Sequence, residues 1–485
     1  MNRKVKFAIL SIILIVYIVA MIPKAFQNDT FFDIALGEKI IEKGLTNEEE
    51  LVFHEGLEFK NPRWLFDYFC AHIYNASGEL GISLMVLIIG CLEMLFYFYI
   101  TYKISGSLYA AFFYSIIVGF FTRHSYTARG QLISFFMFLI EFYAIQKYFE
   151  TYKKRYLFIT ILVMPIIAYT HGSIYVMTIS FFVPYIAEYI LSKIKKLNFE
   201  GKLIVENRKI ALLIIPIIAF VLIGLYTPNN LNLLTYSYKT MQGEKHISEM
   251  EPVNFFDDIL FTVSLSSLFI ILVFSKTKIR ITDLLYIVGY SIVTFKASRG
   301  IHYFYLFSTI CMFRVYCDHF RDYVGEVKLS KKSKKIIGTI GVLIIIYIIT
   351  YSTNIIVTKL NSEYVPYEEY PVDVANYLIQ NVDYKNAHIY TDYNYGSYLE
   401  FRGIPVFLDS RAELFTPAFN EDTTILEDYY SIAGGRVNYN VIFDKYGIDY
   451  VVLQKAQQMP YNYIKSDDKW EAVYDDISFV IYKRK

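Results

Sequence analysis

Long apolar runs separated by short polar connections extend over the first three quarters of the chain. Each run is long enough, or nearly long enough, to cross the hydrocarbon core of a bilayer as a helix, which takes about 20 residues. The runs cover residues 7 to 22, 80 to 100, 106 to 121, 131 to 149, 157 to 170, 173 to 192, 210 to 226, 258 to 275, 281 to 296, 300 to 317 and 336 to 357. The pattern predicts an α-helical polytopic membrane protein with about eleven transmembrane helices.

The pattern changes after residue 358, where β-branched and alternating runs are separated by turn and helix signals. The clearest runs are NAHIYTDY, GIPVFLD, IDYVVLQ and ISFVIYKR. Such runs are typical of strands in a small α/β unit. We therefore expect two domains, a transmembrane domain over 1–358 with a long first outer loop over 23–79, and a soluble extracytoplasmic α/β domain over 359–485.

Basic clusters occur in every second connection, and these connections are cytoplasmic under the positive-inside rule. The clusters are RKVK at 3 to 6, KKR at 153 to 155, KIKK at 193 to 196, KTKIR at 276 to 280 and KLSKKSKK at 328 to 335. The rule predicts a multi-pass cell-membrane protein with a cytoplasmic N-terminus and an outer C-terminal domain. The net charge of +1 gives no global field for nucleic acid.

The first outer loop begins with QNDTFFDIALGEKIIEKGL, which has the spacing of an amphipathic helix on the membrane surface. Asp29 and Asp33 fall within its apolar arc. A carboxylate that faces protein or lipid is costly unless it is paired. We therefore expect a catalytic or metal-binding role for Asp29 or Asp33; the alternative is that Asp29 caps the helix and Asp33 makes an ordinary polar contact.

Four basic or imidazole side chains lie near outer helix ends, where the positive-inside bias leaves few of them. They are Arg129, His171, Arg299 and His302. Grouped around one pocket, they would suit the phosphate of a lipid-linked substrate, because arginine presents a planar fork to phosphate oxygens. The alternative is interfacial anchoring of each side chain on its own.

Taken together, these residues resemble the GT-C superfamily of membrane glycosyltransferases. DTFFDIALGEKIIEKG followed by NPRWLFDYFCAHIYNASGELGISLMVL is similar to the first loop of the family, with an acid after the first span, a Gly eight residues later and a Trp-Leu before the next helix. Later motifs of the family are matched in their order along the chain and in their side of the membrane. The matching stretches are TARGQLISFFMF, THGSIYVM, the HISEMEP loop with Glu249, and ASRGIHYF. DYNYGSYLEFRGIPVFLDSRAELF resembles the outer domain of many members.

The resemblance implies an inverting transfer of a sugar from a polyprenyl-phosphate-linked donor to a glycan, lipid or protein acceptor at the outer membrane face. It implies Asp29 as the general base or acceptor-orienting carboxylate and Arg129 and Arg299 as phosphate contacts, with His171, Glu249 and His302 as further substrate-binding residues. Similar sequences often carry an aromatic pair and a His after the acid, whereas this chain has Phe31, Phe32 and Asp33. Asp33 would supply a second carboxylate for catalysis or for a divalent cation, Mg²⁺ or Mn²⁺, whose involvement stays open.

A partly apolar surround would raise the pKa of Asp29 towards usefulness as a base. In the outer domain, Asp392, Tyr395, Asp409, Arg411 and Glu413 suggest an acceptor-glycan site, but a Gly396 turn and a buried contact between Asp409 and Arg411 would explain them better as framework.

Two other functions remain open. A lipid-carrier or polysaccharide flippase, or a transporter, would line a pathway with intramembrane charges, but Glu93 and Glu141, which could pair, are the main ones at mid-depth. A non-catalytic membrane assembly protein would keep the architecture and bind partners through the outer domain.

Overall fold

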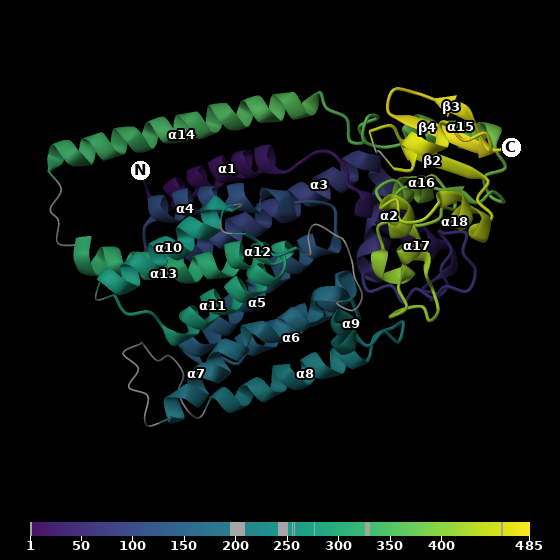
Figure 1. Ribbon diagram of the computed structural model, residues 1–485. Helices are drawn as coiled ribbons and strands as arrows, with labels where there is room; N and C mark the ends of the chain where they lie inside the picture. Colours follow the sequence, from purple (N-terminus) through teal and green to yellow (C-terminus); the bar gives the residue numbers. More distant parts are fainter. Residues whose placement is uncertain are drawn as a thin grey trace.

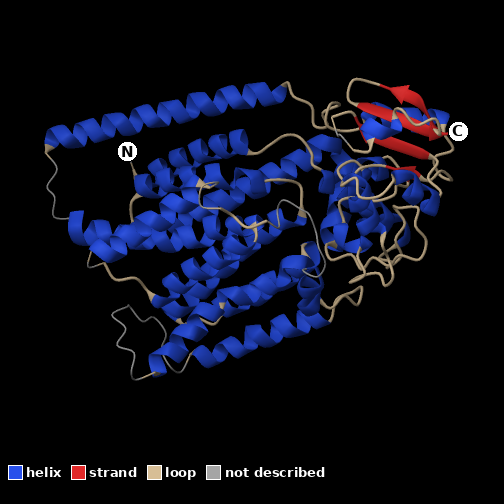
Figure 2. Ribbon diagram, in the orientation of Figure 1, coloured by secondary structure: helices blue, strands red, loops and turns tan. Residues whose placement is uncertain are grey.

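The computed structural model describes residues 2–194, 209–240, 251–254, 256, 258–275, 277–324, 330–456 and 459–485. Most of these residues are helical, and a small sheet lies at one end of the helix bundle (Figures 1 and 2). The bundle contains α1 (Arg3–Met21), α3 (Trp64–Ser105), α4 (Leu108–Thr122), α5 (Gly130–Thr151), α6 (Arg155–Thr170), η2 (Gly172–Phe181), α7 (Val183–Lys193), η3 (Ile210–Leu213), α8 (Ile214–Leu225), α9 (Leu233–Thr240), α10 (Ile259–Phe274), α11 (Ile281–Lys296), α12 (Ile301–Tyr303), α13 (Thr309–His319) and α14 (Lys331–Leu360).

Each apolar run predicted to span the membrane coincides with helix, but the runs differ in length and regularity. Among the described residues, five helical segments are long and apolar enough to cross a bilayer: α1, α3, α5, the segment from Gly172 to Lys193, and α14. α6, α10 and the segment from Ile210 to Leu225 are shorter apolar helices. The structure therefore supports several apolar helices, while the number eleven stays a prediction.

Two of the predicted spans differ in detail from the structure. α3 begins at Trp64 and not near residue 80, so it includes the last part of the predicted outer loop, and it is kinked at Gly78, whose φ of 57° lies in the left-handed region. The run over 300 to 317 is divided by a π-helical turn, η6 (Phe304–Ser308). α14 lies along α1 at the edge of the bundle, and most of its surface is exposed (Figure 1).

Glu93 and Glu141 do not pair within the bundle, contrary to the suggestion from the sequence. Glu93 accepts a hydrogen bond from the Tyr126 hydroxyl at 3.2 Å. Both carboxyl oxygens of Glu141 are buried without a hydrogen-bond partner among the described residues. Two separate buried acids do not form a charged pathway, so the structure adds no support for the flippase.

The residues after α14 combine helices with one four-stranded sheet. β1 (Ile389–Tyr390) pairs in parallel with β2 (Tyr450–Gln454), and β4 (Phe479–Arg484) pairs antiparallel with both β2 and β3 (Trp470–Asp475), giving the order β1-β2-β4-β3. The helices are α15 (Val372–Asn381), α16 (Gly396–Phe401), η8 (Ala412–Phe415), α17 (Ile425–Ala433), α18 (Tyr439–Tyr446) and α19 (Tyr461–Ile464).

Three of the four predicted strand runs contain strands of this sheet. The run GIPVFLD over 403–409 does not contain a strand. It forms an isolated parallel bridge between Val52 of the first loop and Val406, and the Phe407 amide donates to the Ile389 carbonyl of β1 at 2.9 Å. The predicted division at residue 358 therefore separates two parts that pack together: the first loop and the C-terminal residues.

α2 (Asn28–Lys43) forms the predicted helix of the first loop, but its environment differs from a membrane surface. All residues from Thr30 to Gly37 are buried, because α2 lies between α3 and α16. The Phe31 ring packs against the rings of Tyr370, Tyr398 and Phe401. Gly37 permits the approach to α3, since a Cβ there would lie 2.1 Å from the Asp67 carbonyl oxygen. This packing fixes the direction in which the first turn of α2 points.

Candidate functional site

Asp29 lies in the first turn of α2, and its carboxylate contacts Arg129 and Ser410. The N-cap residue is Gln27, which makes no side-chain capping bond, so the expectation that Asp29 serves only as a cap is wrong. The Thr30 hydroxyl donates to the Ala128 carbonyl at 3.2 Å and fastens this turn to the segment before α5. Asp29 is thereby held beside Arg129.

Arg129 and His171 come together because α5 begins where α6 ends. A Cβ at Gly130 would lie 2.0 Å from the Thr170 carbonyl oxygen, so only glycine allows this contact. Arg129 directly precedes Gly130, and its Nε lies 2.6 Å from Asp29 Oδ2. An ion pair at this distance with both side chains largely buried is stronger than a surface pair.

Arg63 is a third member of the site, and our sequence reasoning missed it. The Gly172 amide donates to the Pro62 carbonyl at 2.7 Å and so places Arg63 next to His171. Its guanidinium lies 3.8 Å from Asp29 Oδ2 and 3.4 Å from Asp33 Oδ1, and it stacks on the Phe32 ring at 4.3 Å. The available signal was an arginine in the NPRWLF stretch, 30 residues after Asp33 in the same first loop.

Asp29, Arg63, Arg129 and His171 line a cavity of about 450 Å³. α2, which carries Asp29, lies at the end of the bundle near the sheet (Figure 1). The C-terminal residues close the cavity from the opposite side with Tyr370, Tyr393, Asn394, Ser410, Ala412 and Glu413. The Ser410 hydroxyl donates to Asp29 Oδ1 at 3.0 Å, and the Tyr393 hydroxyl donates to the Ser410 carbonyl at 2.7 Å. Arg299 also lines the cavity, is exposed, and makes no ion pair with a described residue.

Two predicted site residues do not line this cavity, and a third falls outside the described residues. Asp33 is fully buried behind Asp29, where it faces Arg63. His302 lies behind Phe135, and its Nδ1 is 2.6 Å from the Ser125 hydroxyl. Glu249 belongs to the undescribed segment 241–250. The structure therefore brings together Asp29, Arg129, His171 and Arg299 of the predicted set.

The charges in the cavity correct our expectation for the pKa of Asp29. Burial raises the pKa of Asp29, but the charges of Arg129 and Arg63 and hydrogen bonds from Arg129 and Ser410 outweigh burial, so the pKa of Asp29 lies below its usual value. Asp29 is therefore an ionised carboxylate held by guanidinium groups. It becomes a better base only if a ligand draws these groups away.

His171 was expected among the cations but is neutral at neutral pH. Burial, together with the charges of Arg63, Arg299 and Arg129, lowers the pKa of His171 to about 3. Its Nδ1 is buried without a hydrogen-bond partner in the described part of the chain. Neutral His171 can thus offer a hydrogen bond to a ligand, but no charge.

Asp33 behaves in the opposite way to Asp29. Burial raises the pKa of Asp33 well above its usual value, and the charges of Asp67 and Asp29 add to this effect, while Arg63 opposes it. Asp33 lies behind the cavity wall, with Oδ1 3.4 Å from Arg63, and it does not line the cavity itself.

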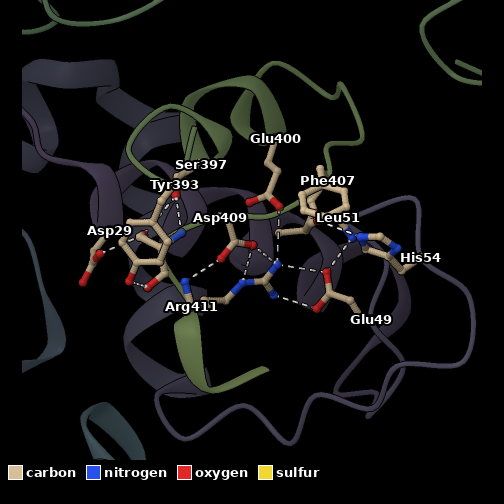
Figure 3. Close-up of polar contacts among 11 residues, drawn as sticks. Asp29, Glu49, Leu51, His54, Tyr393, Ser397, Glu400, Phe407, Asp409 and Arg411 are labelled. Atoms are coloured by element: carbon tan, nitrogen blue, oxygen red, sulfur yellow. Dashed lines mark hydrogen bonds and ion pairs between the residues drawn. The ribbon is translucent and has the colours of Figure 1, made fainter. Parts of the chain in front are cut away.

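The residues of the C-terminal part that suggested an acceptor site mainly form framework. Arg411 is buried and binds Asp409 through Nε at 2.8 Å, as Figure 3 shows. Its Nη1 donates to Glu49 at 2.6 Å and its Nη2 to Glu400 at 3.4 Å. This network joins the first loop to the C-terminal part and holds Ser410 beside Asp29. Asp392 and Tyr395 bind Tyr429 and Gln454, and only Glu413 of the five lines the cavity.

The cavity does not fit a divalent cation as its side chains are arranged. Magnesium and manganese prefer several oxygen ligands, whereas Asp29 is already compensated by two guanidinium groups. Among the described residues, the one other carboxylate that lines the cavity is that of Glu413, which accepts a hydrogen bond from Tyr236. No group of three or more His, Cys, Asp and Glu side chains suited to a metal occurs among the described residues.

No family model and no curated protein sequence matches the chain, but solved structures do. The oligosaccharyltransferase of Archaeoglobus fulgidus in its apo form has a TM-score of 0.60 at 10% identity, over 93% of this chain and 70% of that chain. The same enzyme tethered to an acceptor peptide has a TM-score of 0.65 at 11% identity, over 93% and 69%. Other structures of that enzyme contain dolichol-phosphate, or Zn and sulfate.

ArnT from Cupriavidus metallidurans is similar over almost its whole length. The structure of ArnT bound to undecaprenyl phosphate has a TM-score of 0.55 at 11% identity, over 99% of this chain and 97% of that chain. Both enzymes are polyprenyl-phosphate-dependent glycosyltransferases of the GT-C superfamily. The chain therefore has the GT-C fold, as its resemblance to that superfamily predicted.

Proposed function

We propose that this protein is a membrane glycosyltransferase that moves a sugar from a polyprenyl-phosphate-linked donor to a glycan, lipid or protein acceptor at the outer face of the cell membrane. The observation that carries the proposal is the ionised Asp29 carboxylate, bound to Arg129 at 2.6 Å in a cavity that also contains Arg63 and Arg299. One acid that can take a proton and several cations that can stabilise phosphate are the two needs of such a transfer.

The donor phosphate binds at Arg299 and Arg129 in this proposal. Arg299 is exposed in the cavity and has no acidic partner among the described residues, so a phosphate can bind it without displacing another group. Arg129 is 23% exposed at its side chain, more than Arg63 at 11%. Arg129 can therefore move from Asp29 to phosphate, while Arg63 stays between Asp29 and Asp33.

The transfer proceeds as a single displacement. The acceptor hydroxyl oxygen attacks the sugar carbon that carries the phosphate, the bond from this carbon to the phosphate oxygen breaks, and polyprenyl phosphate leaves with the electron pair. Asp29 takes the acceptor proton, and the guanidinium groups stabilise the charge on the leaving phosphate. A single displacement inverts the sugar carbon, which is the stereochemical outcome that we propose.

Asp29 gains basicity when the donor binds. Arg129 and Arg63 lower the pKa of Asp29, so a phosphate that draws Arg129 away raises this pKa. The proton acceptor is then most active when the donor is in place. Tyr393, Asn394 and Glu413 face Asp29 from the C-terminal part and are suited to hold the hydroxyl groups of the acceptor.

The similar structures give independent support for the ligand class. ArnT binds undecaprenyl phosphate, and the archaeal oligosaccharyltransferase binds dolichol-phosphate and an acceptor peptide. The basic connections favour an outer location for the Asp29 end of the bundle under the positive-inside rule.

The decisive experiment measures acceptor-dependent release of polyprenyl phosphate by the protein reconstituted in vesicles with a host membrane lipid extract. The wild-type protein should release it when a host glycan or protein fraction is added, and Asp29→Asn should release it at least about a hundredfold more slowly. Movement of the carrier across the bilayer without release would favour a flippase. No release and no movement would favour an assembly protein.

A further inference from the structure

A second cavity, of about 220 Å³, lies at the opposite end of the bundle from Asp29. α5 connects the two: Gly130 lines the Asp29 cavity, and Gln146, Lys147 and Glu150 line the second cavity. Twenty residues of α-helix measure about 30 Å, close to the thickness of the hydrocarbon core. The second cavity therefore lies at the level of the opposite membrane interface.

The second cavity carries an excess of positive charge. Its lining contains five cations, namely Lys103, Lys147, Arg280, Arg314 and Arg321, and two acids, Glu150 and Asp318. Lys147 pairs with Glu150, Arg321 with Asp318, and buried Arg314 with Asp283 at 2.6 Å. Lys103 and Arg280 remain without an acidic partner in the described part of the chain. These two unpaired cations favour the binding of an anion in the cavity.

An unpaired hydrogen-bond donor lies in the same cavity. Gln146 is 7% exposed, and its Oε1 accepts a hydrogen bond from Arg314 at 2.9 Å. This bond fixes the orientation of the amide, and Nε2 is left buried without a partner among the described residues. A buried donor without a partner costs free energy. A bound acceptor oxygen would remove this cost, so Gln146 points to a ligand independently of the charges.

We propose that this cavity binds the phosphate of an anionic phospholipid headgroup. Its walls come from α3, α5, α13 and η7 (Phe320–Val324), with Arg280 just before α11, so it opens between helices at the depth where headgroups lie. Basic pockets between helices at this interface are suited to phosphate headgroups. Lys103 and Arg280 supply the charge, and Gln146 Nε2 donates to a phosphate oxygen. The site is about 30 Å from Asp29 and is independent of the transferase function proposed above.

The test measures lipid binding by the full chain in detergent, with phosphatidylglycerol and phosphatidylcholine as probes and native mass spectrometry and the thermal midpoint as readouts. Wild-type protein should retain phosphatidylglycerol in preference to phosphatidylcholine and should unfold at a higher temperature with phosphatidylglycerol. The double variant Lys103→Gln/Arg280→Gln should bind phosphatidylglycerol at least about tenfold more weakly. Gln146→Leu should weaken it by a smaller factor.

The matched control is Lys153→Gln/Lys154→Gln, which removes two exposed lysines just beyond the same end of α5 and outside the cavity. This control should bind phosphatidylglycerol like the wild type. An equal loss in the control and the test variant would overturn the proposal and leave only a general attraction of basic loops to anionic membranes. Inorganic phosphate alone could also stabilise the protein as much as the lipid does, and this effect could be lost in Lys103→Gln/Arg280→Gln. That result would keep the phosphate site but overturn its assignment to lipid.

Discussion

The Arg129 guanidinium lies 2.6 Å from the Asp29 carboxylate, although the two residues are separated by 100 positions in the chain. Two further contacts fix this relationship: Thr30 binds the Ala128 carbonyl, and Gly130 packs on Thr170. The carboxylate is therefore held in its charged form until something competes for Arg129. The predictions below follow from this ion pair and from the groups that hold it in place.

Substitution of the cavity arginines should weaken phosphate binding. Arg129→Gln and Arg299→Gln should each weaken the binding of undecaprenyl phosphate about tenfold or more, because each loses a charge-assisted hydrogen bond. Arg129→Lys should recover only part of the loss, since lysine lacks the planar fork. Arg123→Gln is the matched control, because Arg123 precedes the same segment but does not line the cavity. Unchanged binding in both variants would exclude these arginines as phosphate contacts.

Stability should decrease with acid in a way that depends on His171. The pKa of His171 is about 3 in the folded protein and 6.5 without the fold. The unfolded chain therefore binds a proton below pH 6.5 that the native protein does not bind until about pH 3, so His171 reduces stability as the pH falls through this window. His171→Gln should make the thermal midpoint fall less steeply between pH 6.5 and pH 4. An unchanged slope would mean that His171 titrates normally.

Removal of Arg411 should destabilise the protein more than any surface substitution. Arg411→Met would leave Asp409, Glu49 and Glu400 buried without their cation, which costs about 3–5 kcal/mol for a broken buried ion pair. Arg436→Met removes an exposed arginine and should change the stability by less than about 0.5 kcal/mol. Thermal unfolding in detergent compares the two variants. Equal midpoints would contradict a structural role for the network.

Chelators should have little effect on the transfer rate. The arrangement of Arg63 and Arg129 around Asp29 supplies positive charge where a divalent cation would otherwise be needed. Transfer by the reconstituted protein should therefore continue within about twofold after treatment with EDTA. A loss of activity that Mg²⁺ or Mn²⁺ restores would show that the arginines do not serve this purpose.

The sequence predicted the features that depend on local pattern. Apolar runs located the bundle helices because lipid requires long continuous hydrophobic segments. The helical spacing after Gln27 located α2, and the apolar arc identified Asp29 as a costly acid. Local pattern does not show which distant groups meet this acid. Arg63 was missed for this reason, and the contribution of Ser410 from the C-terminal part was missed for the same reason.

The positions of Asp33 and His302 outside the cavity have a similar cause. Asp33 shares the helix face of Asp29, but α3 covers it, so it supports Arg63 from behind the cavity. His302 lies near the same helix end as Arg299, but it turns towards Ser125. A helical wheel gives the direction of a side chain and not the identity of its neighbour.

The most direct test of the central claim is the affinity of Asp29→Asn for undecaprenyl phosphate. If phosphate competes with the Asp29 carboxylate for Arg129, the neutral amide should leave Arg129 more available, and undecaprenyl phosphate should bind several-fold more tightly to Asp29→Asn than to the wild type, while transfer is lost. Equal or weaker binding by Asp29→Asn would contradict the account.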